Sequence, residues 1–238
     1  MLNNRICIVT GAAQGIGKEI ANLFLKNGAI VIGIYYNHDT IFENGIDYYK
    51  LNVAETKQCE LVVETIVEKY KKVDVLVNCA GITRDALTKK MSEEQFDAVV
   101  EVNLKGVWNM TRLIGPLMQD NKGGSIINIS SVVGIFGNIG QANYAATKAG
   151  VIGMTKTWAK EFAFKGGNVR VNAIAPGYTM TNMLSTVPQE LLEKYAGQTM
   201  LGRLAQPSEI ANVALFLASD MSSYVTGTTI QADGGMRL

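Results

Sequence analysis

Short runs rich in β-branched and other apolar residues alternate with longer stretches of helical periodicity along the chain. This alternation indicates βαβ units, because neighbouring parallel strands need a helical crossover between them. Strands are expected near residues 6–10, 29–35, 48–52, 73–78, 125–130, 169–174 and 228–232. Helices are expected near residues 16–27, 55–71, 93–119, 143–165, 188–196 and 207–219. The sequence therefore predicts an α/β fold built on a parallel sheet.

Length and composition fit one domain spanning residues 1–238, because a chain of this size can share one core and no repeat or linker divides it. Lys and Arg total 22 against 21 acidic residues, so the net charge of +1 gives no field that would attract nucleic acid or an anionic membrane. Three scattered cysteines and a single histidine, His38, argue against a disulfide scaffold and a metal centre.

The first expected strand begins close to residue 1, and no apolar run reaches the ~18 residues of a membrane span. We therefore expect a cytoplasmic protein without a secretion leader. Only residues 36–47 separate the second and third strands, barely the ~10–12 residues that a crossover with its helix requires. That helix is expected to be shortened to a turn or two.

The first turn from strand to helix is rich in glycine, with Gly11, Gly15 and Gly17 following Thr10. Glycine lets the backbone bend and approach a ligand closely, and the helix beginning near Ile16 directs its first N–H groups toward an anion. Such a turn also occurs without any ligand. Combined with the motifs below, it predicts a pyrophosphate site.

Several polar residues follow at strand ends and within helices. Asn78, Cys79, Ala80 and Gly81 end the fourth strand at the edge where open α/β sheets bind ligands. A further asparagine, Asn103, lies within an expected helix, although asparagine is a mediocre helix former. A solvated helix face is the alternative explanation for it.

Ser131 closes the fifth strand, and Tyr144 and Lys148 stand four residues apart on the next expected helix. Positions i and i+4 lie on one helical face with Cβ atoms ~5–6 Å apart. A free phenol titrates near ~10, and a unit charge ~4 Å away at an effective dielectric of ~20 is worth ~4 kcal/mol. Lys148 is therefore expected to lower the pKa of Tyr144. Taken alone, the pair also fits a solvated helix surface and the serine an ordinary turn.

With these motifs in this order, the chain resembles the short-chain dehydrogenase/reductase family, in particular the bacterial 3-oxoacyl-(acyl-carrier-protein) reductases of fatty-acid synthesis. The resemblance extends from about Arg5 to Arg237 and includes residues 81–85, 140–144, 175–177 and 234–235. It implies a Rossmann fold with seven parallel strands in the order 3-2-1-4-5-6-7 and helices on both faces. It also implies NAD(P)H-dependent reduction of a 3-oxoacyl thioester to the 3-hydroxyacyl thioester.

The resemblance implies a catalytic tetrad of Asn103, Ser131, Tyr144 and Lys148. Tyr144 would give a proton to the carbonyl oxygen that Ser131 also bonds, while the reduced nicotinamide gives hydride to the carbon. Lys148 would lower the pKa of the tyrosine and hold the nicotinamide ribose. Asn103 would support a water path that returns the proton.

Cofactor contacts are implied along the same edge of the sheet. They are Gly11, Gln14, Gly15, Ile16, Gly17, Tyr35, Tyr36, Asn52, Val53, Asn78, Ala80, Gly81, Tyr144, Lys148, Pro176, Gly177, Thr179 and Thr181. Thr181 would bind the carboxamide, and residues 182–204 would form a substrate lid. Leu184, Val187 and Met200 are expected to contact the acyl chain or, alternatively, to serve as core or interface side chains.

The choice between NADPH and NADH lacks its usual electrostatic markers. Gln14 stands where NADPH-dependent relatives commonly carry arginine, and Tyr35 stands where NAD-dependent relatives carry aspartate. We expect NADPH on family habit, with Asn37 or His38 near its 2′-phosphate. Asp39 reaching the 2′-hydroxyl of NADH is the alternative, as is a solvated loop.

Partners are inferred from the resemblance as well. Lys122 and Lys165 are candidate contacts for an acyl carrier protein, although Ser125 stands where arginine is common. Relatives form homotetramers that pair the helices carrying Asn103 and Tyr144 and, at a second interface, the last strand and the helix at 207–219. Alternative substrates are acyl-CoA, a hydroxysteroid or another small ketone. The alternative outside enzymes is a catalytically silent nucleotide sensor or structural subunit.

Overall fold

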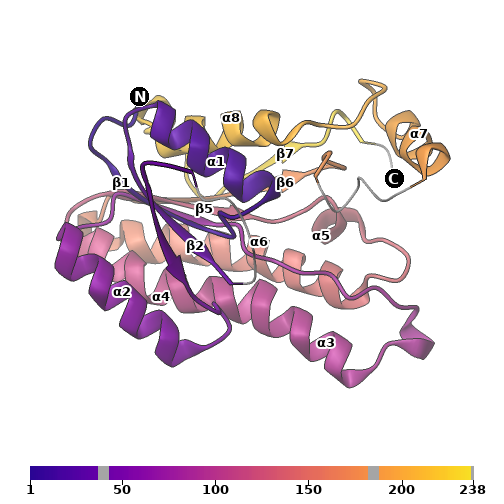
Figure 1. Cartoon of the computed structure of the whole chain (residues 1–238), viewed down its shortest axis with the longest axis horizontal. Helices are drawn as coiled ribbons and strands as arrows, with labels where there is room; N and C mark the ends of the chain where they lie inside the picture. Colours follow the sequence, from indigo (N-terminus) through magenta and orange to yellow (C-terminus); the bar gives the residue numbers. More distant parts are fainter. Residues whose placement is uncertain (37–42, 182–187, 237–238) are drawn as a thin grey trace.

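The computed structural model describes residues 1–36, 43–181 and 188–236. Its centre is a seven-stranded sheet of parallel strands in the order β3-β2-β1-β4-β5-β6-β7, which confirms the predicted fold (Figure 1). The strands are β1 (Ile6–Thr10), β2 (Ile30–Tyr35), β3 (Ile46–Lys50), β4 (Val75–Asn78), β5 (Gly124–Ile129), β6 (Val169–Pro176) and β7 (Thr229–Ala232).

Helices cover both faces of the sheet (Figure 1). One face carries α1 (Gly15–Lys26) and α8 (Pro207–Ala218), and the other carries α2 (Thr56–Tyr70), α4 (Gly106–Asp120) and α6 (Ala142–Ala163). Three shorter helices, α3 (Glu93–Val100), α5 (Val133–Phe136) and α7 (Gln189–Gly197), lie toward the carboxyl ends of the strands. No helix in the described part of the chain has the length and apolar character needed to cross a membrane.

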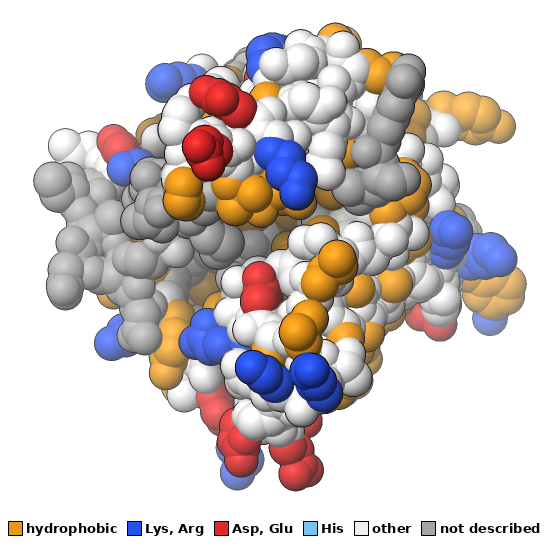
Figure 2. All heavy atoms as spheres, turned by 90° about the vertical axis from the view of Figure 1, so that its right-hand side faces the viewer, with side chains coloured by type: hydrophobic (Ala, Val, Ile, Leu, Met, Phe, Trp, Pro, Cys, Tyr) orange, Lys and Arg blue, Asp and Glu red, His pale blue; other side chains and the backbone are white. Residues whose placement is uncertain are grey.

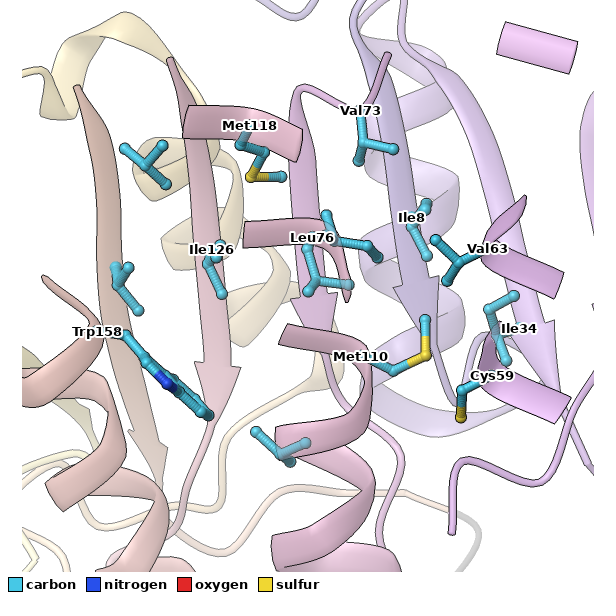
Figure 3. Packing of buried hydrophobic residues seen from close by; sticks show 14 of the residues in the cluster. Ile8, Ile34, Cys59, Val63, Val73, Leu76, Met110, Met118, Ile126 and Trp158 are labelled. Atoms are coloured by element: carbon cyan, nitrogen blue, oxygen red, sulfur yellow. The ribbon is translucent and has the colours of Figure 1, made fainter. Parts of the chain in front are cut away.

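The core consists of two apolar layers, one on each face of the sheet. Successive strand residues point to opposite faces, so Ile8 belongs to the layer beneath α2, α4 and α6, whereas Val9 belongs to the layer beneath α1 and α8. Figure 3 shows the first layer, in which Met110 and Trp158 from the helices pack toward strand residues such as Ile126. Burial on both faces explains the continuous apolar runs of the strands.

The residues of the third strand differ from the prediction. It was expected at residues 48–52 and instead spans Ile46–Lys50, because Ile46 pairs with Val31 and completes the apolar layer beneath α1. Asn52 lies beyond the strand, where its side-chain oxygen accepts a hydrogen bond from Ala54 N at 3.1 Å and turns the chain. The shortened helix expected between β2 and β3 falls mostly on residues 37–42, outside the described residues.

The helix expected at residues 93–119 is interrupted. A π-helical turn, Glu101–Lys105, separates α3 from α4 and contains Asn103. Periodicity does not signal such a turn, which depends on the tertiary contacts of Asn103 described below. The short helix α5 and the 3₁₀ turn Thr88–Lys90 were not predicted either.

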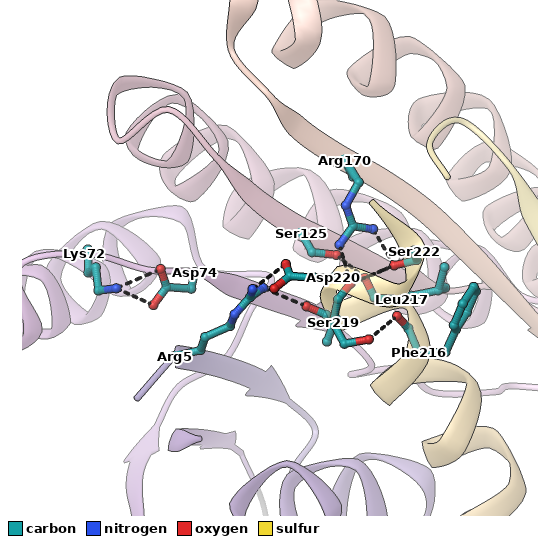
Figure 4. Close-up of polar contacts among 11 residues, drawn as sticks. Arg5, Lys72, Asp74, Ser125, Arg170, Phe216, Leu217, Ser219, Asp220 and Ser222 are labelled. Atoms are coloured by element: carbon teal, nitrogen blue, oxygen red, sulfur yellow. Dashed lines mark hydrogen bonds and ion pairs between the residues drawn. The ribbon is translucent and has the colours of Figure 1, made fainter. Parts of the chain in front are cut away.

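Two arginines hold the carboxyl end of α8 at the amino edge of the sheet (Figure 4). Arg5 donates to Ala218 O at 3.1 Å, and Arg170 donates to Ser219 O at 3.2 Å. The hydroxyl of Ser125 donates to Leu217 O at 2.8 Å. These donors satisfy carbonyl groups that a helix end leaves without intrahelical partners. Ser125 is therefore buried and supports α8.

Candidate active site

The carboxyl ends of the central strands bring the predicted site residues together. The glycine-rich turn follows β1, residues 79–81 follow β4, Ser131 follows β5, and residues 177–181 follow β6. In a parallel sheet these ends meet at one edge. The first turns of α6 bring Tyr144 and Lys148 to the same edge.

The glycine-rich turn is shaped for close approach by a ligand. Gly11 has φ +70°, and a Cβ atom at this position would lie 3.0 Å from Ala80 Cα. At Gly17 a Cβ atom would overlap the carbonyl oxygen of Gly11. Gly15 has φ +53°, and a Cβ atom there would lie 3.4 Å from Thr181 Cγ2. The turn therefore needs glycine, and it lies against Thr181.

Helix α1 begins at Gly15 with an open amino end. Gln14 occupies the N-cap without a side-chain hydrogen bond, and the first turn contains no acidic residue. Unsatisfied N–H groups and the positive end of the helix dipole favour an anion at this place. The glycines next to this open helix end keep the space beside it free of side chains. The site therefore fits the pyrophosphate of a dinucleotide.

The ends of β1 and β4 are joined by the hydroxyl of Thr10, which accepts hydrogen bonds from Cys79 N at 2.9 Å and Ala80 N at 3.0 Å. Asn78 is buried, and its amide donates to Thr111 Oγ1 and Asn128 Oδ1 at 3.0 and 2.8 Å. The side chain of Asn78 therefore supports the sheet from within.

Asn103 forms hydrogen bonds with the backbone of the segment that follows β4. Its side-chain oxygen accepts from Ile82 N at 2.8 Å, and its amide nitrogen donates to Ile82 O at 2.9 Å and to Thr147 Oγ1 at 3.5 Å. A side-chain amide that pairs with both backbone groups of one residue fixes that residue's position. The π-helical turn places Asn103 within reach of Ile82, where its side chain is fully buried beside α6.

Ser131 and Tyr144 form the polar centre of the site. Ser131 is mostly buried and accepts a hydrogen bond from Val133 N at 3.1 Å, while Tyr144 is half-buried. Burial raises the pKa of Tyr144 to about 12, and a hydrogen bond with the Ser131 hydroxyl opposes this increase. The phenol is therefore protonated at neutral pH.

Lys148 lies next to this pair. Its ammonium donates to Ile129 O at 2.8 Å and stands 5.5 Å from the centroid of the Tyr144 ring. Burial lowers the pKa of Lys148 to about 8, and Cys79 opposes this effect. The expectation that Lys148 lowers the pKa of Tyr144 needs correction for the ligand-free protein, because burial dominates at the phenol and the opposing contribution comes from Ser131.

Cys79 lies within electrostatic range of Lys148. Burial raises the pKa of the Cys79 thiol to about 11, against the opposing effect of the Lys148 charge. Because the thiolate is the reactive form, this thiol is protonated and unreactive at neutral pH. Its environment argues against rapid alkylation.

Two supporting residues were not singled out from the sequence. The hydroxyl of Ser130 donates to Lys148 O at 2.8 Å, so the end of β5 holds Lys148 by both its backbone and its ammonium. Asn143 is fully buried, and its amide nitrogen donates to Arg84 O at 3.0 Å and Gln95 O at 3.1 Å. Their only sequence signal is adjacency to Ser131 and Tyr144.

The residues expected at the adenosine end lie after β2 and β3. Tyr35 packs edge-to-face on Tyr48, with ring centroids 6.3 Å apart, and Tyr36 is exposed. Val53 is buried, and its carbonyl accepts from the Asn109 amide at 2.9 Å. The candidates Asn37, His38 and Asp39 lie outside the described residues.

The expected lid is described from residue 188 onward, so Leu184 and Val187 fall outside the described residues. Tyr195 of α7 stacks on Tyr178, which follows Gly177 after β6, with ring centroids 4.0 Å apart and planes at 16°. Met200 is exposed and lines a cavity of about 450 Å³ together with Tyr178. Thr179 is buried, and its hydroxyl donates to Gly177 O at 3.0 Å.

A glycine-lined dinucleotide edge beside a tyrosine, a serine and a lysine defines a class of oxidoreductases. A family model described as Enoyl-(Acyl carrier protein) reductase matches residues 11–237. The chain belongs to the short-chain dehydrogenase/reductase family of NAD(P)-dependent oxidoreductases, which confirms the resemblance seen in the sequence.

Individual relatives are similar over their full lengths. A 3-oxoacyl-(acyl-carrier-protein) reductase of Thermotoga maritima is 52% identical, with 99% of this chain and 98% of the relative covered. The enzyme of the same name from Staphylococcus aureus is 42% identical, with 99% of each chain covered. An oxidoreductase of Mycobacterium bovis is 44% identical, with 99% of this chain and 98% of the relative covered.

Proposed function

We propose that this protein reduces 3-oxoacyl thioesters to 3-hydroxyacyl thioesters with NADPH, as a step of fatty-acid synthesis. The observation that carries the proposal is the hydrogen bond between Ser131 and Tyr144 beside the buried ammonium of Lys148. Two hydroxyl groups that meet at one point suit a single carbonyl oxygen. The names of the 52% and 42% identical relatives supply the substrate class.

The residues at the sheet edge fit the parts of the cofactor in order. Gly11, Gly15 and Gly17 with the open end of α1 would hold the pyrophosphate, Lys148 the nicotinamide ribose, and Thr181 the carboxamide. When bound, the reduced nicotinamide supplies hydride to the carbonyl carbon.

The chain's own residues handle the oxygen. As the carbon gains hydride, the electron pair of the C=O double bond moves to oxygen, where Ser131 donates a hydrogen bond and Tyr144 transfers its proton. The high pKa of Tyr144 keeps this proton in place until an alkoxide, a much stronger base, develops. The ammonium of Lys148 then stabilises the phenolate that remains.

The phenolate must regain a proton for the next turnover. A water path beside Asn103 would supply it. The hydrogen bonds of Asn103 indicate its part in this path. Both ends of its amide bind the backbone of Ile82, so the side chain would shape the wall of the path by holding that residue.

The preference for NADPH rests on the lack of a carboxylate at the two positions, 14 and 35, that are expected near the adenosine ribose. Neither Gln14 nor Tyr35 carries a carboxylate that would repel a 2′-phosphate. Lys18 is the positive group four residues along α1 from Gln14, and it pairs with Glu43 at 3.2 Å. A 2′-phosphate would compete with Glu43 for this ammonium.

Reduction of a 2-enoyl thioester is a second candidate, because the matching family model is described as an enoyl reductase. That reaction places hydride on the β-carbon and a proton on the α-carbon. Ser131 and Tyr144 instead interact through their hydroxyl groups, and two neighbouring hydroxyls suit a single oxygen. The geometry therefore favours the 3-oxoacyl substrate.

The test combines substrate and cofactor. The purified protein is assayed with the N-acetylcysteamine thioesters of 3-oxobutanoate and 2-butenoate, each with NADPH and with NADH. We expect reduction of the 3-oxo substrate, at least tenfold faster with NADPH at equal subsaturating concentrations, and no reduction of the enoyl substrate. Faster reduction of 2-butenoate would contradict the substrate, and a preference for NADH would contradict the cofactor.

A further inference from the structure

The chain has no regular secondary structure over residues 79–87, which we call the post-β4 segment. Its outer part is attached to the beginning of α6. Ala86 N donates to Gly140 O at 2.9 Å, and the side-chain amide of Gln141 donates to Asp85 Oδ2 at 3.0 Å. A segment without a helix or strand of its own depends on such contacts for its position.

The side chain of Asn143 joins the post-β4 segment, α3 and α6 at one buried point. Its amide nitrogen donates to Arg84 O at 3.0 Å and Gln95 O at 3.1 Å, and its side-chain oxygen accepts from Tyr144 N at 2.7 Å. Hydrophobic, basic and acidic side chains lie side by side on the surface at this end of the molecule (Figure 2), whereas Asn143 is 0% exposed. Three parts of the site therefore depend on one buried amide.

The partners of the Asn143 amide determine its orientation. Two backbone carbonyls require its NH₂ group, and the N–H of Tyr144 requires its oxygen. The bond to Tyr144 N also satisfies a donor at the beginning of α6, whose N-cap residue, Gln141, forms no side-chain hydrogen bond with the helix. A carboxylate of the same size would face both carbonyl oxygens without a proton to donate. The position therefore requires an amide.

The inner part of the post-β4 segment adjoins the tetrad. A Cβ atom at Gly81 would lie 3.3 Å from Asn103 Oδ1 and 3.6 Å from Lys148 Nζ. In the proposed function Gly81 borders the cofactor, so this segment forms one wall of the cofactor site. The distance from that wall to Tyr144 then sets the geometry in which hydride and proton reach the carbonyl, and a displacement of ~1 Å can cost ~10²-fold in rate.

We propose that Asn143 is a positioning residue for the reduction, which fixes the backbone of Tyr144 relative to the post-β4 segment. This inference rests on the proposed function and adds a residue outside the tetrad. Because its side chain is fully buried, Asn143 acts through Tyr144 N on one side and through Arg84 O and Gln95 O on the other. Its loss slows hydride transfer and leaves cofactor binding in place.

The test compares Asn143→Ser and Asn143→Asp with a control, Asn172→Ser. Asn172 is equally buried in β6, where its amide donates to Val225 O at 2.8 Å and accepts from Thr228 N at 3.2 Å. The control therefore loses hydrogen bonds of a buried amide to backbone outside the site. Asn143→Asp keeps the size and the acceptor for Tyr144 N but loses both donors.

Hydride transfer from NADPH to the N-acetylcysteamine thioester of 3-oxobutanoate is followed in a single turnover, and KM, kcat and NADPH affinity are measured beside it. We expect both Asn143 variants to lose roughly 10–10²-fold in the hydride-transfer rate and in kcat, with KM and NADPH affinity changed less than about threefold. Asn172→Ser should keep its rate within about threefold of the unaltered protein. Equal rates in Asn143→Ser and Asn172→Ser, or a full rate in Asn143→Asp, would overturn the proposal.

Hydrogen exchange measured by mass spectrometry tests the positioning without a substrate. In the ligand-free protein, Asn143→Ser should speed amide exchange in peptides covering residues 84–97 and 142–148, and Asn172→Ser should leave these peptides unchanged. Equal exchange of these peptides in both variants would overturn the positioning role. Failure of the unaltered protein to reduce the thioester would overturn the proposed function, whereas the exchange measurement still decides whether Asn143 holds these segments together.

Discussion

At the scale of single residues, the chemistry depends on how burial distributes protons between Tyr144 and Lys148. Burial raises the pKa of the phenol and lowers that of the amine, so each neutral form is favoured. At neutral pH the phenol is protonated and can act as an acid. The amine, with a pKa of about 8, is mostly charged. This combination suits reduction, in which the acid must be protonated before the carbonyl arrives.

The lowered pKa of Lys148 predicts a particular pH dependence of stability. Above pH 8 the folded, cofactor-free protein releases this proton while the unfolded chain keeps it up to its ordinary value of 10.5. The unfolded chain then binds more protons, so the contribution of Lys148 to the free energy of unfolding rises with pH. Below pH 8 the cost of burying the charge is fully present.

Urea denaturation at pH 7, 8 and 9 checks this expectation against a Lys148→Met variant. The difference in unfolding free energy, unaltered protein minus variant, should rise little from pH 7 to 8 and more steeply from pH 8 to 9, by up to about 1.4 kcal/mol per pH unit. Taking the difference cancels contributions from the other buried groups. A constant difference up to pH 9 would show that Lys148 titrates normally, and a falling one would show that its pKa is raised; either would contradict the account.

At the scale of elements, the sequence predicts the placement of the site better than its supports. Strand ends and the glycine spacing locate Gly11, Ser131 and Tyr144 at one edge, because parallel strands leave no other place for them. The π-helical turn around Asn103 and the hydrogen bond from Ser130 to Lys148 O depend on contacts between distant segments. No local propensity or period encodes such contacts.

The glycine-rich turn gives a prediction for an element. A Gly17→Ala substitution puts a Cβ atom onto the Gly11 carbonyl, so the turn must shift, and we expect a loss of roughly 1–3 kcal/mol in unfolding free energy. NADPH affinity, measured by fluorescence titration, should fall as well. Gly197→Ala is the control, because a Cβ atom there meets nothing within 4 Å. Equal NADPH affinity in both variants would show that the glycine-rich turn does not bind the cofactor.

At the scale of the whole molecule, exposed apolar side chains include some on the two segments that were expected at subunit interfaces. Phe96 and Trp108 are 42% and 44% exposed on the segment from α3 to α4, and Met221 and Tyr224 are exposed just beyond α8. Two separate apolar surfaces fit the two interfaces of a tetramer with dihedral symmetry. The strand order was predictable from the resemblance, but the exposure of these particular side chains was not.

Light scattering after size exclusion tests the assembly. We expect a mass near four times the 25.8 kDa of the chain. A Trp108→Glu substitution places a charge on one of the two surfaces and should halve that mass, because the second interface persists. A monomeric unaltered protein would contradict the tetramer.

The central claim is that the phenol of Tyr144 protonates the carbonyl oxygen. Its most direct test is a single-turnover measurement with Tyr144→Phe, in which enzyme saturated with NADPH is mixed with a 3-oxoacyl thioester. Tyr195→Phe serves as control, because it removes a hydroxyl from the Tyr178 stack outside the tetrad. We expect the Tyr144 variant to bind NADPH with unchanged affinity and to lose ~10²–10⁴ in the rate of hydride transfer, while the control stays active. A Tyr144→Phe variant as fast as the unaltered protein would contradict the account.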